Sequence, residues 1–403
     1  MTLHAAVFVR DRFTWLAYFM LAYYAYMQAT LSQVMLFLSQ ELNLNYTVRG
    51  YHISAFALGM VLAGVSADRV AQRFGRRVSF WGGGLGMALG ALLLALGHHP
   101  TITIASSFVM GFVGSYLLVM IQATLSDKYG DSRAIALTES NILASITAGL
   151  APLFVGGFQS LGFGWRIALL LGIVSWLLMA TFWRNTGFPQ SQANPASNTL
   201  GKSALPIAFW AYIVAVFINV AIEWSMIFWG AEFLETAVGL TGDAATAMMT
   251  AFFVAMVIGR VVGSTLTRKL RSAQLLLAAI GIIMVGFPLF WLPRFAPLNI
   301  LGLFIAGLGI ANLFPLTLAS ATSAAPLYAN KASARVSMAS GTAILIAPQI
   351  LGSIGDQVGI ENAYGMVGLL ALTALLVTVT ANRLAAHNPS LVELEQRAAP
   401  IQQ

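Results

Sequence analysis

The chain has 403 residues, of which 58% are hydrophobic and only 9% are charged, and its mean hydropathy is +0.80. Charged residues make up about 25% of an ordinary water-soluble domain, so this composition excludes a soluble globule and indicates a protein of the lipid bilayer. The formal net charge is +7 and there is no cysteine, which excludes disulfides, thiolate metal sites and cysteine nucleophiles.

Twelve long apolar segments follow one another along the chain. A hydrocarbon core of about 30 Å needs roughly 20 helical residues to cross, and a helix satisfies its own backbone polar groups in lipid. The first segment is too long for a cleavable signal peptide, and we expect it to be a permanent span. We therefore predict an all-α integral membrane protein with twelve transmembrane helices, at residues 13–38, 50–70, 78–97, 101–125, 135–160, 165–184, 205–231, 243–267, 273–292, 297–322, 333–356 and 362–383.

The basic residues are distributed unequally between the two sides of the predicted membrane. Only Arg49, Arg166 and Arg294 fall in the loops opposite the termini, and Arg260 falls within a span. Lys and Arg in short loops favour the cytoplasmic side, so we expect both termini in the cytoplasm and the protein in the cytoplasmic (inner) membrane. This topology explains the positive net charge without a nucleic-acid partner, although the basic loops can contact anionic lipid headgroups.

A polar stretch divides the twelve segments six and six. It contains Pro189 and Pro195 among Ser, Asn and Gln residues, a composition typical of a linker. We predict four parts: an amino-terminal six-helix bundle at 1–185, a cytoplasmic linker at 186–204, a carboxy-terminal six-helix bundle at 205–385 and a cytoplasmic tail at 386–403.

The two halves repeat one another. A shift of 196 residues aligns Ala151-Pro152 with Ala347-Pro348, Gly111 with Gly307 and Tyr116 with Asn312, and a shift of 199 aligns Gly64, Asp68 and Arg69 with Gly263, Thr267 and Arg268. The matches fall in corresponding spans, which indicates a duplicated six-helix unit. Parallel repeats of this kind predict a binding site between the halves, near the midplane of the membrane.

A basic sequence motif follows the second span. Gly64, Asp68 and Arg69 are followed by Gly75-Arg76-Arg77, with four extra residues, 70–73, in between. Without those four, the pattern resembles the signature G-x-x-x-D-R-x-G-R-R of the major facilitator superfamily. Four residues are about one helical turn, so we expect them to lengthen the helix and keep Asp68 and the arginines in phase.

Further residues extend this resemblance over nearly the whole chain. They are Gly164-Trp165-Arg166 before the sixth span, Gly259-Arg260 in the eighth and Phe314-Pro315 in the tenth. Together with a glutamate in the seventh span, the last two pairs resemble the branch that contains fucose–proton symporters and related permeases. The resemblance implies a major facilitator fold of two six-helix bundles and transport by alternating access.

Glu223 lies within the seventh predicted span, with Asn219 on the same helical face. An ionised carboxylate in hydrocarbon costs some 2.5 kcal/mol or more, so Glu223 should face a cavity or a partner, or carry a proton. We predict that it couples transport to protons and contacts substrate. The alternative is a structural carboxyl near the outer end of the span.

Arg260 is the natural partner of Glu223, but the two residues differ in depth. Their offsets from the middle of their spans add to about 16 Å at 1.5 Å per residue, which is too far for a direct ion pair. We expect Arg260 to act nearer the cytoplasmic side, either as a substrate contact or as a helix-packing charge bonded to carbonyls.

The basic motif also has a predicted mechanical role. Its arginines can pair with Asp127 or Glu139 and hold one arrangement of the helices, and in transporters that it resembles such pairs break and form again during alternating access. The alternative is that these positive charges only fix the orientation of the protein in the membrane, a role that Lys would fill equally well. The predicted gating set is Gly64, Asp68, Arg69, Arg73, Gly75, Arg76, Arg77, Asp127 and Glu139.

A polar stripe runs along the first span, at helical spacing. A polar stripe should avoid lipid, and Tyr23 matches Asn219 in the repeat, so the first and seventh spans should present equivalent positions to a shared cavity. Tyrosines can instead lie in interfacial belts. The predicted substrate-binding residues are Tyr23, Tyr26, Thr30, Tyr116, Gln122, Asn219, Glu223, Arg260 and Asn312, with Gln33 on the same stripe.

Other classes of site find little support. His98, His99 and His52 have no acidic or histidine cluster at ligand spacing, so we expect solvated loop histidines and no metal site. A phosphate loop and a nucleophile constellation are both missing, which argues against ATP-driven transport, a cofactor and any enzyme. We expect a monomer whose partners are a small-molecule substrate, protons and the lipid bilayer.

These observations predict a secondary active transporter that moves a small solute by alternating access, as proton-coupled symport of a polar metabolite. Proton-driven efflux of drug-like or lipophilic compounds is the alternative within transport, and the single Glu with a mostly aromatic, Met-bearing cavity suits either. From another class, a membrane sensor that has lost transport would keep the fold. Retention of Glu223 and the basic motif argues against the sensor.

Overall fold

The computed structural model describes residues 9–189, 205–267, 269–325 and 329–386, and within these ranges the chain forms helices and no strand. Most of the predicted linker and tail, residues 190–204 and 387–403, lies outside the described residues. The predicted all-α fold is confirmed.

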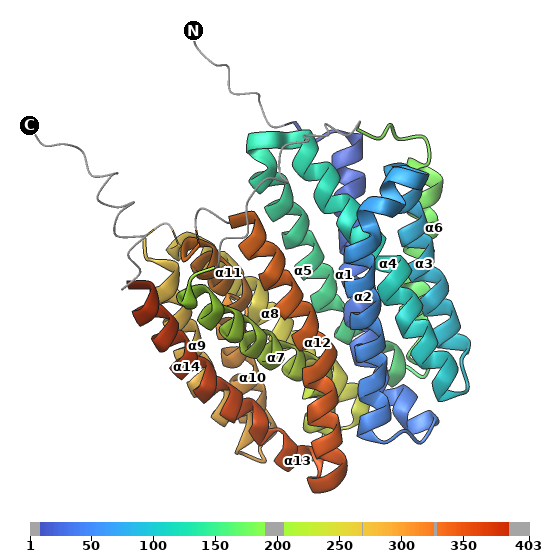
Figure 1. Ribbon diagram of the computed structural model, residues 1–403. Helices are drawn as coiled ribbons and strands as arrows, with labels where there is room; N and C mark the ends of the chain where they lie inside the picture. The colour runs from blue at the N-terminus through green and yellow to red at the C-terminus, as the bar shows by residue number, and fades with distance from the viewer. Residues whose placement is uncertain (1–8, 190–204, 268, 326–328, 387–403) are drawn as a thin grey trace, which may run out of the picture. The chain divides into compact units, whose positions relative to one another are not determined.

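Six long helices make up the first half (Figure 1). They begin and end close to the predicted positions, because a long apolar run bounded by polar residues fixes both ends of a span. The helices are α1 (Arg12–Glu41), α2 (Tyr46–Phe74), α3 (Arg76–Leu96), α4 (Pro100–Tyr129), α5 (Arg133–Ser160) and α6 (Arg166–Trp183), with a short 3₁₀ turn, η1 (Gly130–Ser132), before α5.

The second half contains eight helical segments, two of which are short continuations of a neighbouring span. They are α7 (Ile207–Thr236), α8 (Gly242–Leu266), α9 (Ser272–Trp291), α10 (Ala296–Ile310), α11 (Leu313–Ser323), α12 (Ala329–Val358), α13 (Ile360–Ala363) and α14 (Gly365–Ala386). The segments α10 and α11 share one predicted span, and α13 leads into α14.

The chain divides into two compact units. The first comprises Met1–Asn194 together with Thr241–Phe253, and the second comprises Pro195–Leu240 together with Val254–Gln403. The first half of α8 is therefore grouped with the first unit. Within the first unit α1 packs on α5 and α4 packs on α2 and α3, and within the second α7 packs on α11, α12 and α14.

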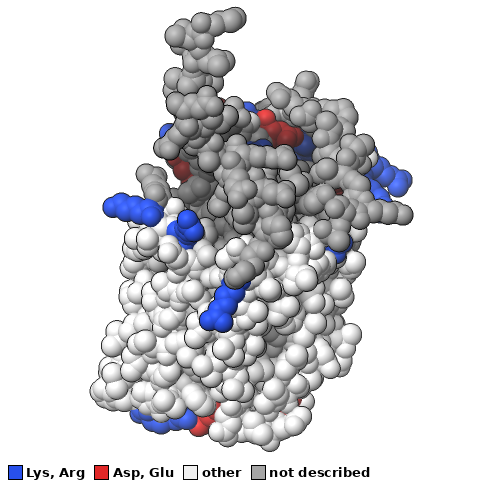
Figure 2. Space-filling model, turned by 60° about the vertical axis from the view of Figure 1, so that its left-hand side comes forward, with Lys and Arg blue, Asp and Glu red and all other residues white. Residues whose placement is uncertain are grey.

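The described helices have the length and hydropathy of membrane spans. Eleven of them qualify, counting α10 with α11 and α13 with α14, and α1 is not among the eleven. Its polar stripe lowers its mean hydropathy, but it is a 30-residue helix that is buried along most of its length. Charged side chains gather mainly at the two ends of the helices on the face shown in Figure 2, with a broad uncharged surface between them.

The four extra residues of the basic motif lie inside α2. This helix continues to Phe74, so residues 70–73 add a turn to it, as the sequence predicts. Gly75 then separates α2 from α3 with φ +85°, a left-handed conformation that only glycine adopts without strain. The motif thus places a glycine where two helices meet with no other residue between them.

The tenth predicted span is interrupted. Its first helix ends at Ile310 and the second begins at Leu313, so that Phe314-Pro315 lie in the first turn of α11. Proline has no N–H to bond the carbonyl four residues earlier, here Ala311, and its ring crowds that carbonyl. Pro315 therefore explains why α10 and α11 are separate helices.

Candidate transport site

Asn219 is the most deeply buried amide in the middle of α7. It is 0% exposed, and its Nδ2 donates a 2.9 Å hydrogen bond to the Thr317 hydroxyl of α11. The Thr317 hydroxyl in turn donates to the Leu313 carbonyl. Among the described residues the Asn219 Oδ1 accepts no hydrogen bond. A buried acceptor without a donor costs about 1–3 kcal/mol, so this oxygen is a candidate contact for a bound molecule.

Glu223 lies one helical turn after Asn219 and is half-buried. Its carboxylate interacts electrostatically with the Arg260 guanidinium of α8, within the second unit. An arginine side chain is long, and this interaction is compatible with the difference in depth between the two positions. The expectation that the two residues form no direct ion pair stays a prediction.

Asn312 lies at the interruption between α10 and α11, where it holds α8. Its Nδ2 donates a 2.7 Å hydrogen bond to the Gly259 carbonyl. Gly259 and Gly263 allow this approach, because a Cβ at Gly259 would lie 2.6 Å from the Leu308 carbonyl oxygen and one at Gly263 would overlap the Asn312 amide. Gly259 therefore lets α8 pack closely against α10 and the start of α11, and the next residue, Arg260, places a charge beside this contact.

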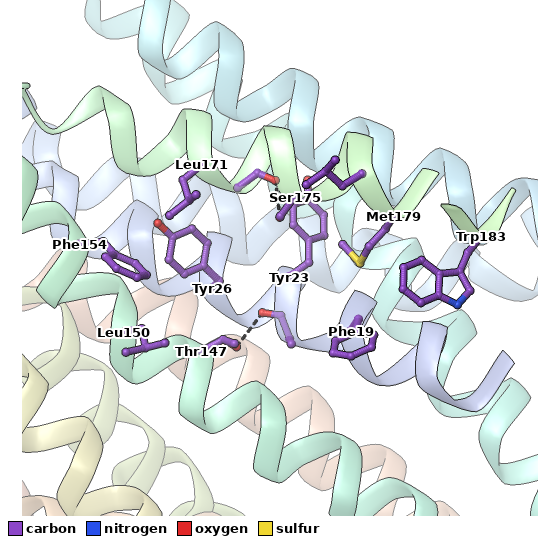
Figure 3. A pocket seen from close by; sticks show the side chains of 13 residues that line it. Phe19, Tyr23, Tyr26, Thr147, Leu150, Phe154, Leu171, Ser175, Met179 and Trp183 are labelled. Atoms are coloured by element: carbon purple, nitrogen blue, oxygen red, sulfur yellow. Dashed lines mark hydrogen bonds between the residues drawn. The ribbon is translucent and has the colours of Figure 1, made fainter. Parts of the chain in front are cut away.

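The polar stripe of α1 is bonded within the first unit. The Tyr23 hydroxyl donates to the Gly84 carbonyl of α3 at 3.1 Å, and the Tyr26 hydroxyl donates to the Ala168 carbonyl of α6 at 2.8 Å. Thr30 donates to the Tyr26 carbonyl of its own helix. Both tyrosine rings line a pocket among α1, α5 and α6 (Figure 3). The hydroxyls of this stripe thus join helices to one another.

The remaining predicted substrate residues lie apart from one another on α4. Tyr116 is buried, and its hydroxyl lies 2.8 Å from the Ser66 hydroxyl of α2. Gln122 is exposed. Of the predicted substrate residues, Asn219 and Glu223 lie one turn apart on α7, Glu223 interacts with Arg260, and Asn312 bonds the carbonyl of the residue before Arg260.

The basic motif forms one of its two predicted ion pairs. Arg76 Nη1 lies 2.7 Å from Asp127 Oδ2, which links α3 to α4. Glu139, in contrast, pairs with Arg10, whose Nε donates at 2.8 Å, and it accepts a 3.0 Å hydrogen bond from the Tyr18 hydroxyl. Of the two carboxylates that the sequence offers the motif arginines, Asp127 is therefore paired with Arg76, and Glu139 is occupied by Arg10, which lies just before α1.

The other members of the motif are on the surface. Gly64, Asp68, Arg69 and Arg73 are exposed, and the Arg73 guanidinium lies 5.5 Å from the Phe74 ring centroid. Arg77 donates to the Arg184 carbonyl just after α6. The gating role of the set stays a prediction.

Gly164-Trp165-Arg166 closes the opposite end of the first unit. Arg166 donates to both carboxylate oxygens of Glu41, at 2.9 and 2.6 Å, and the Trp165 indole donates to the same carboxylate at 2.8 Å. The Arg166 Nε also bonds the Ala95 carbonyl at the end of α3. This cluster ties α1, α3 and α6 together and gives the tripeptide a structural role.

Sequence reasoning missed Thr317 and misjudged His52. A threonine in a long apolar segment gives no signal of its own, and only its place opposite Asn219 makes it part of the site. His98 and His99 are exposed, as predicted, but His52 is 0% exposed. Its Nε2 lies 2.8 Å from the Thr103 hydroxyl of α4, so the prediction of a solvated histidine is wrong at this position.

A family model of the Major Facilitator Superfamily matches the chain over residues 14–329 and again over 213–402. The chain belongs to this superfamily. It is therefore a multi-pass membrane transporter, as the resemblance of its motifs predicts. The second match covers the second half, which agrees with the internal repeat. No group of three or more His, Asp or Glu side chains in the described ranges is placed to hold a metal ion.

Curated members of the superfamily match part of the chain. An uncharacterized MFS-type transporter of Yersinia pestis is 28% identical over 157 residues, 39% of this chain and 41% of that protein. The putative metabolite transport protein YwtG of Bacillus subtilis is 26% identical over 39% of this chain and 35% of its own length. The drug efflux pump JefA of Mycobacterium tuberculosis is 29% identical over 34% and 27%. The matches thus span less than half the length of these relatives.

Solved structures of superfamily transporters share the fold. A bacterial homolog of the human lysosomal transporter Spinster, in an inward-facing and occupied conformation, has a TM-score of 0.78 at 14% identity and covers 94% of this chain and 98% of that chain. The nucleoside transporter NupG, in a point-mutant form, has a TM-score of 0.75 at 11% identity, over 91% and 98%. At these identities the likeness concerns the fold alone.

Proposed function

We propose that this transporter moves a small polar solute across the cytoplasmic membrane as a proton symporter, with Asn219 contacting the solute and Glu223 carrying the proton. The observation that carries the proposal is the unpaired Oδ1 of Asn219, buried one turn from an intramembrane carboxyl. A hydroxyl or amine of a solute would supply the missing donor. Intramembrane carboxyls in transporters serve proton and substrate pathways by default.

Coupling follows from the surroundings of Glu223. Glu223 lies within α7 and interacts with the Arg260 charge, so a conformational change that moves this charge or admits water to the carboxyl would alter the binding of a proton. Proton and solute occupancy must each change the relative stability of two conformations. Movement of residues 1–185 against 205–385, exposing the site to one side and then the other, would supply those conformations.

The orientation is part of the same proposal. We place both termini in the cytoplasm because most Lys and Arg residues fall in the loops on the terminal side. A reporter fused after Arg397 should therefore be active only as a cytoplasmic reporter.

Efflux of lipophilic compounds is the second candidate. The match to a drug efflux pump over 34% of the chain favours it, and the match to a putative metabolite transport protein favours a metabolite as the solute. A membrane sensor would bind solute without moving it.

The first experiment finds a ligand and then measures flux. Purified protein is screened by thermal shift against sugars, organic acids, amino acids and lipophilic cations, and each hit is tested in proteoliposomes with and without an imposed pH gradient. We expect uptake to follow the gradient, and Glu223→Gln to lower gradient-driven uptake at least tenfold while ligand still raises the melting temperature. Glu223→Asp, which keeps the carboxyl, is the matched control.

Each alternative has its own outcome. Wild-type uptake that ignores the pH gradient defeats proton coupling. Export of lipophilic cations with no response to polar solutes favours efflux, and ligand binding without flux in any direction favours the sensor. Crosslinks that lock the two halves together and leave flux unchanged would contradict alternating access.

A further inference from the structure

The pocket in Figure 3 lies within the first unit. Its volume is about 390 Å³, and α1, α5 and α6 form its walls. Phe19, Leu150, Phe154, Leu178 and Met179 are among the apolar residues that line it, and Leu150 and Leu178 are themselves exposed. The pocket therefore opens on the outer surface of the helices, where lipid surrounds a membrane protein.

The few polar groups in the wall are already bonded. The Tyr23 and Tyr26 hydroxyls donate to carbonyls of α3 and α6, Thr147 donates to the Ala22 carbonyl at 2.9 Å, and Ser175 donates to the Gly172 carbonyl at 2.7 Å. The pocket thus presents aromatic faces and alkyl groups. Its occupant in the bilayer should be a hydrocarbon chain, because these four hydroxyls already donate to carbonyls and, among the described residues, a polar solute would find only the Trp183 indole N–H, at one end of the pocket, as a donor.

The length of the pocket matches one leaflet. Along α6 its lining runs from Leu171 to Trp183, twelve residues apart, which is about 18 Å at 1.5 Å per residue. Half of a hydrocarbon core is about 15 Å. A chain that enters beside Trp183 therefore ends near the middle of the membrane, as one acyl chain of one leaflet does.

A second hollow continues the pocket toward the end of α6. It shares Phe19 and Trp183 with the pocket, has a volume of about 590 Å³ and is otherwise lined by Arg12, Trp15 and Phe182. The Arg12 Nη2 donates a 2.7 Å hydrogen bond to the Phe182 carbonyl. A guanidinium has five N–H donors, so this bond holds Arg12 at the mouth and leaves it able to bind an anion.

Positive charge at this mouth is not balanced by carboxylates. Among the described residues, Arg12, Arg77 and Arg184 form no ion pair within 4.0 Å, and their sequence neighbours at 1–8 and 185–204 contain no Asp or Glu. The nearby Arg10 and Lys128 do pair, with Glu139 and Asp11. The hollow therefore combines Arg12, which has no carboxylate partner among the described residues, with Trp15 and Trp183, whose residue type is typical of the membrane interface.

We propose that the first unit binds one anionic phospholipid here, with an acyl chain in the pocket among α1, α5 and α6 and the phosphate group at Arg12. Arg184 adds long-range attraction at the same end of α6. Cationic clusters beside membrane helices select anionic headgroups, at about 1 kcal/mol per Lys or Arg near the surface. That energy corresponds to about a fivefold preference for an anionic over a zwitterionic lipid from one arginine.

The test measures lipid binding and needs no transport substrate. Full-length protein is equilibrated with equal amounts of phosphatidylglycerol and phosphatidylcholine of identical acyl chains, and retained lipids are counted by native mass spectrometry. We expect wild type to retain phosphatidylglycerol about fivefold over phosphatidylcholine. Arg12→Gln should remove this preference and Arg12→Lys should keep it. Arg69→Gln, at an exposed arginine of α2, is the control.

A second pair of variants tests the pocket itself. Ser175→Phe fills the pocket and should lower retention of both lipids at least fivefold. Val174→Phe adds the same ring to the same helix, at an exposed position outside the pocket lining, and should retain lipid as wild type does. Melting temperatures in detergent without added lipid show whether each variant is folded.

Three outcomes overturn the proposal. They are equal retention of the two lipids by wild type, an unchanged preference in folded Arg12→Gln, and unchanged retention in folded Ser175→Phe. Displacement of the lipid by a transported solute would instead identify the pocket as a solute site, and this would also contradict the proposal.

Discussion

Tyr23 of α1 and Asn219 of α7 stand at matching positions of the two repeats, 196 residues apart, and their side chains meet different surroundings. The Tyr23 hydroxyl ends on a carbonyl of the neighbouring α3, whereas the Asn219 amide bonds Thr317 through its nitrogen and keeps an unpaired buried oxygen. Two helices of the same length at matching positions of the repeat therefore use their polar side chains differently. In α1 the polar groups join helices, and in α7 one of them stays available.

One turn further along, the contrast is one of charge. The position that matches Glu223 is Met27, which is 0% exposed and packs its sulfur against Gly172. The first unit therefore has an apolar contact where the second has a carboxyl. The candidate proton site belongs to the second unit, and the lipid pocket belongs to the first.

Exchanging these two residues should give the largest effect. Met27→Glu buries a carboxyl in a tightly packed apolar site, which we expect to cost about 3 kcal/mol of stability. Glu223→Met should leave stability unchanged or raise it, because it removes a charge from within a span. Melting temperatures of the two variants in the same detergent measure the difference. Similar decreases in melting temperature for Met27→Glu and Glu223→Met would contradict the difference between α1 and α7 that the contacts indicate.

Asn219 offers the next test. Asn219→Leu removes an unpaired buried acceptor, so we expect a melting temperature equal to or above that of wild type, together with loss of the ligand-induced shift. Thr317→Val should behave differently, because it leaves the Asn219 nitrogen without its acceptor and should cost about 1–3 kcal/mol. A full ligand response in stable Asn219→Leu would remove this residue from the site.

A smaller effect is expected from Tyr23→Phe. The change removes one hydrogen bond to the Gly84 carbonyl and should lower stability by about 1 kcal/mol, with solute uptake within about twofold of wild type. Tyr212→Phe in α7 loses a comparable bond, to Asn382 Oδ1 at 2.6 Å, and is the matched control. If Tyr23→Phe lowered uptake far more than Tyr212→Phe does, the Tyr23 hydroxyl of α1 would have to contact the substrate.

The smallest effect concerns the start of α1, where Asp11 caps the helix through the Thr14 N–H at 2.9 Å and pairs with Lys128. Burial alone would raise the Asp11 pKa, but hydrogen bonds from Lys128 and Thr14 outweigh it and lower the pKa. The stabilisation is therefore present above about pH 4 and is lost as the pH falls below that value. Asp11→Asn keeps the cap, and because the Asp11 side chain is about half exposed to solvent it should cost only a few tenths of a kcal/mol at neutral pH. A melting-temperature difference from wild type that does not shrink as the pH is lowered from about 4 would contradict this explanation.

The helices were predictable because each depends on a local property. Runs of apolar residues locate the spans, and the first, predicted at 13–38, is the helix Arg12–Glu41. The extra turn of α2 also follows from spacing alone. What lies near in sequence, or recurs every turn, can be inferred without a structure.

The partners of the polar groups were not predictable in this way. Helical spacing shows that Tyr23 and Tyr26 share a face, but their acceptors lie 61 and 142 residues away in the chain. Glu139 pairs with Arg10, 129 residues away, whereas the motif alone suggests arginines that are nearer in the sequence. Asn219 was predicted from its place beside Glu223, whereas Thr317, 98 residues away, was not. Such pairings depend on how helices pack, and the sequence of one helix does not contain that information.

The interruption at Ala311 and Asn312 affects how the second unit can deform. Pro315 has already removed one backbone bond between α10 and α11, so the span can change direction there without breaking another. Thr317 lies two residues beyond that proline and Asn312 three before it, at the α8 crossing. A bend between α10 and α11 would move the Thr317 hydroxyl relative to α8. Because this hydroxyl accepts a hydrogen bond from Asn219, the bend would also change the surroundings of a solute bound at Asn219.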